Sequence, residues 1–325
     1  MGNPQWEDWV MNEEQSLPIL EHAYKCGINT WDTADFYSHG DSERIIGKAL
    51  KKYNIPRQNV TLLTKCYFGV SHDRTQLPLA ESSINDGPMV NRVGLSRKHI
   101  IDAVDASVDR LGTYIDLLQI HRLDRDVPME EIMRALNDVV NSGKVRYIGA
   151  SSMAAWEFQR LQNIADKNGW HRFVSMQNYL NLIYREEERE MIPYCKATGV
   201  GIIPWSPVAR GILARPWNSA PTKREQTDAY LSALVSRENE ADKAIVDRIE
   251  EIARRKEVPM AAVATAWVLA KGTNPVLGLG SKERIDQAVN AMKLELSEEE
   301  IKYLEAPLPY NEKAGVYTMF VPITD

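Results

Sequence analysis

The sequence has little of what marks several common classes of protein. Its 325 residues include three cysteines and six histidines, and acidic residues outnumber basic ones by 45 to 39, for a net charge of −6. A chain with this charge balance lacks the basic excess that is typical of nucleic-acid-binding proteins. We therefore expect no nucleic-acid partner.

The three cysteines, Cys26, Cys66 and Cys195, stand alone, with no CxxC motif and no pair of histidines at ligand spacing. This pattern predicts neither a structural zinc site nor a disulfide framework, so we expect no metal and a reducing, cytoplasmic location. No apolar run reaches membrane-spanning length, and the polar start MGNPQWEDWV does not have the form of a signal peptide. No membrane association is expected.

What the sequence does contain is typical of a large globular domain. Hydrophobic residues make up 44% of the chain and charged residues 26%, which is enough apolar material for a large core. No Pro/Ser-rich linker and no repeat of short period divides the chain. Residues 1–325 are therefore predicted to form a single domain, a length that one α/β barrel commonly has. Nothing in the sequence predicts an oligomeric state.

Short apolar runs alternate along the chain with amphipathic helical patterns. The predicted strands are Ile28–Asp32, Val60–Lys65, Ile115–His121, Val145–Ser151, Phe173–Gln177, Val200–Ser206 and Pro275–Gly280. The predicted helices cover residues 14–26, 42–52 (capped by Asp41 or Ser42), 96–111, 128–142, 154–167, 185–197, two stretches divided by Pro259, 283–292 and the segment LSEEEIKYLE. Such alternation predicts parallel strands joined by right-handed crossovers. An open dinucleotide-binding sheet would carry GxGxxG after its first strand, and because that fingerprint is missing, a closed (β/α) barrel is favoured.

Polar side chains follow the predicted strands, where a barrel builds its active site. Asp32 ends the first strand, with Tyr37 just beyond it, Lys65 ends the second and His121 the third. These residue types suit acid catalysis by a phenol: an ammonium favours the phenolate, a carboxylate keeps the ammonium in place, and an imidazole hydrogen-bonds the substrate oxygen. Taken singly, each also fits a structural role, as a packing tyrosine, a turn cap, a solvated charge or a structural histidine. Their joint occurrence at successive strand ends favours catalysis.

A series of motifs is similar to the aldo-keto reductase superfamily, and most similar to its branch of fungal aryl-alcohol dehydrogenase-like enzymes and potassium-channel β subunits. The motifs are, in order, GINTWDTADFYSHGDSE, LLTKC, DLLQIHRLD, GKVRYIGASS, SMQNYLN, IPWSPVARGIL and SKERIDQAV. The resemblance covers about Trp9 to Leu304. It implies a (β/α)8 TIM barrel that reduces an aldehyde or ketone with NADPH, and a catalytic tetrad of Asp32, Tyr37, Lys65 and His121, with Tyr37 as the proton donor.

The resemblance also implies a site for NADPH or NADP+. The residues that look like cofactor contacts are Ser151, Ser152 and Gln177 at the nicotinamide carboxamide, Trp205 stacked on the nicotinamide, Ser206, Val208, Arg210 and Gly211 over the pyrophosphate, and Ser281, Lys282, Arg284 and Gln287 at the adenosine 2′-phosphate and adenine. Asp32 and Gly280 are also expected to bind the cofactor. Lys282 and Arg284 at the start of a helix suit a phosphate, although SKER can also be an ordinary capped first turn. Family members often have Asn in place of Ser152.

Members of the superfamily begin with a hairpin and a first barrel strand before a segment like GNPQW. The resemblance therefore implies that the hairpin and that strand are missing from this chain. Two alternatives to an active reductase stay open: an NADPH-binding regulatory subunit and a truncated, inactive paralogue. The substrate is not identified, but five aromatic residues are candidates for a pocket that accepts bulky or aromatic carbonyl compounds: Tyr67, Phe68, Tyr230, Tyr317 and Phe320.

Overall fold

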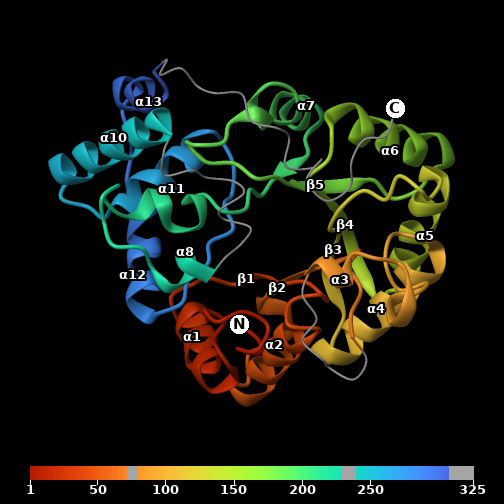
Figure 1. Cartoon of the computed structure of the whole chain (residues 1–325). Coiled ribbons are helices and arrows are strands. Elements are labelled where there is room, and N and C mark those ends of the chain that lie inside the picture. Colours follow the sequence, from red (N-terminus) through yellow and green to blue (C-terminus); the bar gives the residue numbers. More distant parts are fainter. Residues whose placement is uncertain (72–78, 228–238, 307–325) are drawn as a thin grey trace.

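The computed structural model describes residues 1–71, 79–227 and 239–306, and its strands lie inside a ring of helices (Figure 1). The strands are β1 (Thr30–Asp32), β2 (Thr61–Cys66), β3 (Ile115–Ile120), β4 (Val145–Ser151), β5 (Phe173–Gln177) and β6 (Gly201–Ile202). The helices are α1 (Glu13–Lys25), α2 (Asp41–Lys52), α3 (Leu79–Ser82), α4 (Arg97–Leu111), α5 (Met129–Asn141), α6 (Ala155–Asn168), α7 (Met191–Thr198), α8 (Lys223–Thr227), α10 (Glu240–Lys256), α11 (Met260–Ala270), α12 (Lys282–Ala291) and α13 (Glu298–Glu305). Short 3-10 turns are η1 (Arg57–Asn59), η2 (Gly87–Met89), η3 (Glu186–Glu188) and η4 (Ala209–Ala214). None of the described helices combines the length and the apolar character needed to cross a membrane.

The six strands form one sheet in sequence order, and each strand pairs in parallel with the next. This order is the one that a (β/α) barrel requires, and the curled sheet is consistent with part of such a barrel. The absence of the family's hairpin and first strand stays a prediction, as does the single domain. The N-terminal segment is bonded to the residue before the α1 cap and to the turn after β1: Gly2 donates its N–H to Met11 O at 2.9 Å, and the Asn3 N–H donates to Ser38 Oγ at 3.0 Å.

The last predicted strands are shorter than the sequence suggests. In place of Val200–Ser206, the structure has the two residues of β6, and in place of Pro275–Gly280 it has a single bridge between Trp205 and Val276. Prolines and glycines explain the difference, since Pro204 and Pro275 have no N–H to donate and glycines weaken a strand. The Val276 N–H still donates to Pro204 O at 2.8 Å, so the chain before α12 runs beside the end of β6.

Local signals at the helix ends account for most helix boundaries. The helix α1 begins in a capping box of Asn12 and Gln15, and α4 begins at Ser96, whose hydroxyl accepts from His99 N. The predicted cap of α2 by Asp41 or Ser42 is wrong, because Gly40 takes the N-cap position at φ 87°. The Ser42 hydroxyl instead accepts a hydrogen bond from Thr33 Oγ1 at 2.7 Å and is buried.

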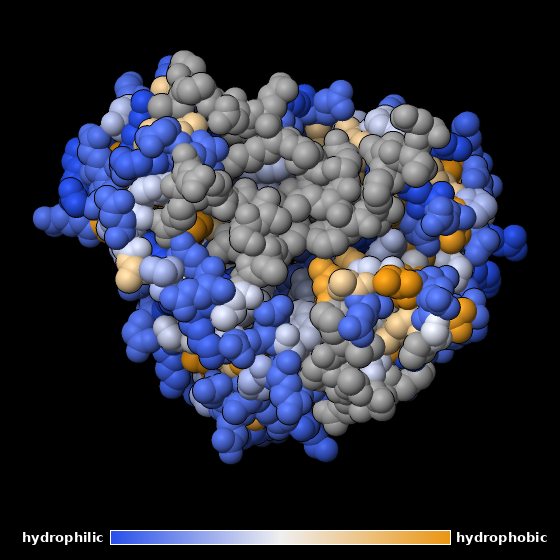
Figure 2. Space-filling model, viewed as in Figure 1, coloured by the Kyte–Doolittle hydropathy of each residue, from blue (hydrophilic) through white to orange (hydrophobic). Residues whose placement is uncertain are grey.

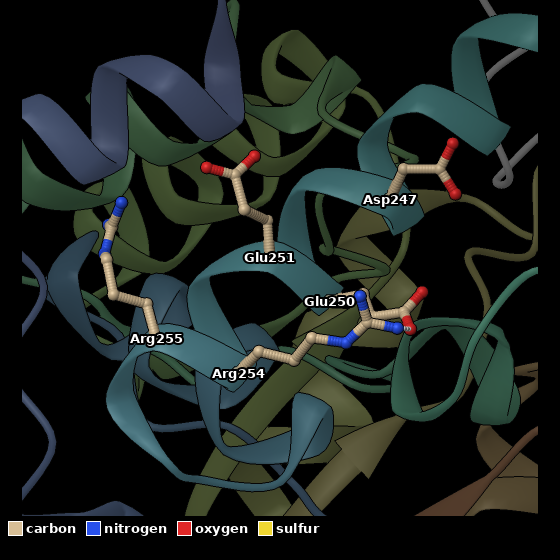
Figure 3. Close-up of a pocket in the computed structure, with 5 residues that line it drawn as sticks. All are labelled: Asp247, Glu250, Glu251, Arg254 and Arg255. Carbon is tan, nitrogen blue, oxygen red and sulfur yellow. Dashed lines mark hydrogen bonds and ion pairs between the residues drawn. The ribbon is translucent and has the colours of Figure 1, made fainter.

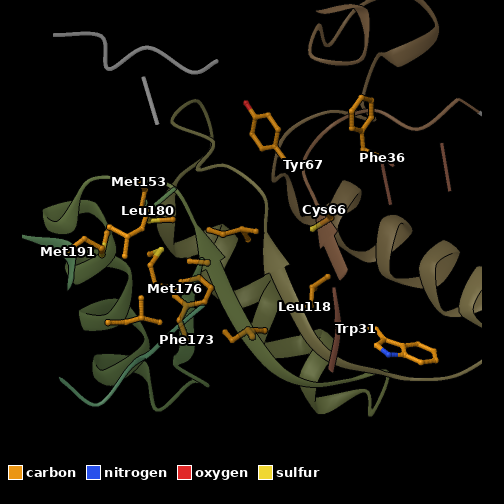
Figure 4. Packing of buried hydrophobic residues seen from close by; sticks show 14 of the residues in the cluster. Trp31, Phe36, Cys66, Tyr67, Leu118, Met153, Phe173, Met176, Leu180 and Met191 are labelled. Carbon is orange, nitrogen blue, oxygen red and sulfur yellow. The ribbon is translucent and has the colours of Figure 1, made fainter. Parts of the chain in front are cut away.

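The apolar core extends along the sheet and under the surrounding helices (Figure 4). Its main cluster of buried side chains includes residues from Leu17 on α1 to Leu304 on α13. Phe158 on α6 stacks on Phe173 on β5 with ring centroids 5.6 Å apart. Because each such side chain contributes roughly 1.5–3 kcal/mol on burial, the helices fix the strands firmly and thereby fix the side chains at the strand ends.

Candidate active site

Lys65 and Asp32 form a buried ion pair at the C-terminal ends of β2 and β1. The Lys65 ammonium donates to Asp32 Oδ2 at 2.5 Å and to Thr33 O at 2.8 Å, and the two side chains are 1% and 9% exposed. Burial lowers the pKa of Lys65, but the Asp32 carboxylate and the Tyr37 phenol outweigh it and leave the pKa above its ordinary value. The ammonium is therefore charged at neutral pH, and a cation is fixed at the strand ends.

Tyr37 and His121 lie beside this pair. The Lys65 Nζ atom is 5.1 Å from the centroid of the Tyr37 ring, and the His121 ring meets the Tyr37 ring edge to face at 5.8 Å. Tyr37 is half-buried in the turn after β1. His121 directly follows β3, and its backbone N–H donates to Cys66 O at 3.0 Å. Burial, Arg122 and Lys65 lower the pKa of His121 well below its ordinary value, so its imidazole is neutral. The structure thus brings together all four residues of the predicted tetrad.

Two amide side chains inside the curled sheet hold the other oxygen of Asp32. Asp32 Oδ1 accepts from Gln119 Nε2 at 3.0 Å and from Gln177 Nε2 at 2.9 Å, and Gln177 Nε2 also reaches Gln119 Oε1 at 3.1 Å. Asp32 is on β1 and Gln177 on β5, four strands apart, which in a flat sheet is roughly 19 Å. Their direct hydrogen bond therefore requires that the sheet curls until its inner side chains meet, as in a barrel.

Sequence reasoning missed Gln119. Gln119 stands two residues before His121, which directly follows β3. Side chains two residues apart in an extended segment point to the same side, so this spacing was a signal that could have identified Gln119.

A chain of hydrogen bonds continues from Gln177 to Trp205. Ser151 Oγ donates to Gln177 O at 2.9 Å and lies 3.5 Å from Ser152 Oγ, which accepts from Trp205 Nε1 at 3.4 Å. The Trp205 ring packs on the Tyr179 ring with centroids 4.4 Å apart. The residues predicted to surround the nicotinamide are therefore connected to one another and, through Gln177, to Asp32.

The segment after Trp205 holds an unusual backbone conformation. Ser206, Ala209 and Arg210 have φ angles of 53°, 46° and 55°, and Gly211 has 111°. A residue other than glycine in this region costs on the order of 1–3 kcal/mol, and such residues concentrate at functional sites. Runs that mix left- and right-handed residues also direct several N–H groups to one side, which favours an anion. Within the loop, Ala209 N donates to Ser206 O and Gly211 N to Val208 O, both at 2.9 Å, and its contact with a pyrophosphate stays a prediction.

The predicted 2′-phosphate residues lie at the start of α12. The Ser281 hydroxyl caps the helix by accepting from Arg284 N at 3.3 Å, and Lys282, Arg284 and Gln287 are exposed. Gly280 precedes them, and a Cβ there would lie 4.0 Å from Arg284 Nη1. Two cations at a helix N-terminus, where the helix dipole is positive, form an environment that suits a phosphate.

Aromatic side chains line the neighbourhood of His121. The Phe68 ring lies 5.1 Å from the His121 ring and 5.1 Å from the Tyr67 ring. The other three candidates for the substrate pocket, Tyr230, Tyr317 and Phe320, lie outside the described residues. Figure 2 shows a mostly hydrophilic face with hydrophobic residues gathered in the region of α3, and the loop there exposes Ile84 and Val90, which are 59% and 51% exposed. Tyr67 and Phe68 therefore lie beside His121 as buried members of the core, and the aromatic substrate pocket stays a prediction.

A surface hollow on α10 is unrelated to the tetrad. Its lining consists of five charged residues of that helix, which Figure 3 shows: Asp247, Glu250, Glu251, Arg254 and Arg255. Arg254 pairs with Glu250 within the helix, and Arg255 pairs with Glu300 on α13 at 2.8 Å. We interpret the hollow as a paired, solvated helix face.

Comparison with known proteins agrees with this geometry. The aldo/keto reductase family matches residues 1–308. Versiconal hemiacetal acetate reductase of Aspergillus parasiticus is 66% identical over 94% of this chain and 90% of that protein. An aryl-alcohol dehydrogenase-like protein of Schizosaccharomyces pombe is 55% identical over 93% of this chain and 88% of that protein. An aldo-keto reductase of Metarhizium robertsii is 50% identical over 94% of this chain and 84% of that protein. These names support an oxidoreductase that acts on carbonyl groups, and the chain belongs to the aldo/keto reductase family.

Proposed function

We propose that this protein reduces an aldehyde or ketone to the alcohol, with NADPH as cofactor and Tyr37 as proton donor. The observation that carries the proposal is the continuous set of hydrogen bonds from Lys65 through Asp32, Gln177 and Ser151 to Ser152. It joins the acid–base residues to those expected to hold the nicotinamide, so the reacting carbonyl would lie between the two groups. We further propose that the chain acts as one domain in the cytoplasm on a small molecule, with neither nucleic acid nor membrane as a partner.

The residues present fit a dinucleotide phosphate. Ser206, Val208, Arg210 and Gly211 would face the pyrophosphate, while Lys282 and Arg284, both exposed at the start of α12, would face the 2′-phosphate. Gln177, Ser151 and Ser152 would hold the nicotinamide carboxamide. When bound, NADPH supplies the hydride for the carbonyl carbon.

Each residue of the tetrad has a separate task in this proposal. Tyr37 gives its phenolic proton to the carbonyl oxygen, and the Lys65 ammonium stabilises the phenolate that remains. Asp32, held by Gln119 and Gln177, keeps Lys65 charged and in position. His121 is neutral, so it can donate one N–H to the same oxygen without competing for the proton. The phenol then regains a proton from water.

The substrate class follows from the aromatic surroundings and from one relative. A hemiacetal is in equilibrium with an open aldehyde, and the Aspergillus parasiticus relative is named for reducing a hemiacetal acetate. Phe68 and Tyr67 beside His121 favour a bulky, apolar carbonyl compound. We therefore propose that the substrate is a bulky aldehyde, including one that is masked as a cyclic hemiacetal.

The experiment is steady-state oxidation of NADPH with a panel of aldehydes that pairs small aliphatic compounds with aromatic and hemiacetal-forming ones. Turnover with a clear preference for the bulky members supports the proposal. Equal turnover of the small aliphatic aldehydes would contradict the substrate class. Tight NADPH binding without turnover of any member would instead favour the regulatory subunit.

A further inference from the structure

Three side chains with metal-binding atoms meet between α1 and α12, away from the tetrad. His22 is in the last turn of α1, Cys26 is its C-cap residue, and Asp286 is on α12. The two helices lie side by side (Figure 1). His22 Nε2 is 2.7 Å from Asp286 Oδ1, and Cys26 Sγ is 3.5 Å from His22 Nε2 and 3.7 Å from Asp286 Oδ1. One nitrogen, one sulfur and one oxygen therefore converge on the same point.

These separations match the edges of a zinc tetrahedron. With Zn–N and Zn–O bonds of about 2.0 Å and a Zn–S bond of about 2.3 Å, the edges that include sulfur are roughly 3.5 Å and the nitrogen–oxygen edge is roughly 3.3 Å. The observed sulfur edges, 3.5 and 3.7 Å, already agree closely, and the His22–Asp286 pair, at 2.7 Å, has to open by about 0.6 Å. His22 and Cys26 are four residues apart, so the helix itself presents both on one face.

We propose that His22, Cys26 and Asp286 bind a divalent transition-metal ion of the zinc type, with a fourth position open to water. On binding, the Cys26 thiol releases its proton to solvent and the thiolate sulfur coordinates the metal, while His22 coordinates through an unprotonated Nε2 and keeps its proton on Nδ1. Cys26 and His22 are partly exposed and Asp286 is exposed, so the ion reaches the site directly from solvent.

The composition of the cluster distinguishes it from an ordinary surface ion pair. A His–Asp pair alone is common on protein surfaces and needs no third residue. Here the Cys26 thiol also lies within 3.7 Å of both partners, which adds a third metal-binding atom that the ion pair does not require. Among residues 1–71, 79–227 and 239–306, no other group of three His, Cys, Asp or Glu side chains has its ligand atoms this close together. One ion per chain is therefore expected.

The position gives the ion a structural consequence. It would join α1, the helix before β1, to α12, the helix that carries Lys282 and Arg284. Because the ion binds the folded chain through residues that are far apart in sequence, its binding should stabilise the fold. This proposal does not depend on the enzyme activity, since its measurements read metal binding and unfolding alone.

The experiment titrates the metal-free full-length protein with Co²⁺ and follows the thiolate-to-cobalt charge-transfer band, with Zn²⁺ as the competitor. We expect one Co²⁺ per chain, displaced by Zn²⁺, and a thermal unfolding temperature that rises and saturates with Zn²⁺. The variant Cys26→Ser should lose the band, and His22→Gln and Asp286→Asn should each weaken binding by at least about tenfold.

His171→Gln is the matched control, because His171 is exposed and bonded to Asn141 Oδ1 at 3.1 Å, outside the cluster. It should bind Co²⁺ as the unchanged protein does. The proposal is overturned if no stoichiometric band appears at millimolar Co²⁺, if the band survives in Cys26→Ser, or if His171→Gln weakens binding as much as His22→Gln does. Circular dichroism of each variant verifies that it is folded. Loss of the cobalt band in a folded variant then reports the loss of a metal ligand and not the loss of the fold.

Discussion

Replacing Lys65 by methionine tests the ion pair at the base of the site. Lys65→Met keeps most of the side-chain length but removes the ammonium, and the Asp32 carboxylate then stays buried without its cation. Removing one partner of a buried pair costs about 3–5 kcal/mol. Because Gln119 and Gln177 still donate to Asp32 Oδ1, we expect the loss at the lower end, about 3 kcal/mol of unfolding free energy.

A double variant separates stability from catalysis. Adding Asp32→Asn to Lys65→Met removes the isolated charge, so the double variant should regain about 1–2 kcal/mol relative to Lys65→Met. Carbonyl reduction should stay low in both, because neither has the ammonium beside Tyr37. Urea unfolding followed by tryptophan fluorescence gives the stabilities, and NADPH oxidation gives the activity.

The result that would refute the reasoning is additivity. If Asp32→Asn and Lys65→Met lower the unfolding free energy independently, so that the double variant loses the sum of both, the two residues do not stabilise each other. A Lys65→Met protein that keeps most of its reductase activity would refute the role of the ammonium.

Three further predictions address other parts of the chain. Arg284→Ala should weaken NADPH binding by on the order of a few kcal/mol and should change NADH binding little, as measured by cofactor fluorescence. Equal losses of affinity for the two cofactors would contradict the placement of Arg284 at the 2′-phosphate. Burial raises the pKa of Glu187 to about 8, so between about pH 4.5 and pH 8 the folded protein holds a proton that the unfolded chain releases. The free energy of unfolding should therefore fall as the pH rises through this range, by up to about 1.4 kcal/mol per pH unit. Glu187→Gln should flatten this part of a urea-unfolding profile, and an unchanged slope would refute the buried proton. Gly47→Ala should destabilise the fold by about 1–3 kcal/mol in the same assay, because a Cβ at Gly47 would lie 2.6 Å from Leu111 O. Gly278→Ala is the control and should be neutral, because a Cβ at Gly278 has no neighbour within 4 Å. Equal effects of the two variants would contradict the close packing of α2 on α4.

The strands that the sequence predicted best are two mostly apolar runs between polar segments. The bounds of β4 and β5, Val145–Ser151 and Phe173–Gln177, are confirmed as predicted, because polar or glycine-containing segments bound each run on both sides. Predictions were wrong where proline and glycine weaken pairing, as in Pro275–Gly280, and at the cap of α2, where a left-handed glycine replaces a side-chain cap.

The contacts that sequence reasoning missed are those that depend on how distant segments pack. The hydrogen bonds of Gln119 and Gln177 to Asp32 require the curvature of the whole sheet, which no local pattern encodes. The contact of Asp286 on α12 with His22 and Cys26 likewise depends on how distant helices pack. The absence of a metal site, which rested on spacing along the chain, stays a prediction, and the metal at these three residues is our proposal.

The most direct test of the central claim is the single-turnover rate of carbonyl reduction by Tyr37→Phe with saturating NADPH. This change keeps the ring that packs against His121 and removes only the hydroxyl. The account predicts a rate lower by about 10²- to 10⁴-fold, with NADPH affinity and unfolding free energy close to those of the unchanged protein. A folded, NADPH-binding Tyr37→Phe variant that reduces the aldehyde at most of the original rate would contradict the assignment of Tyr37 as the proton donor.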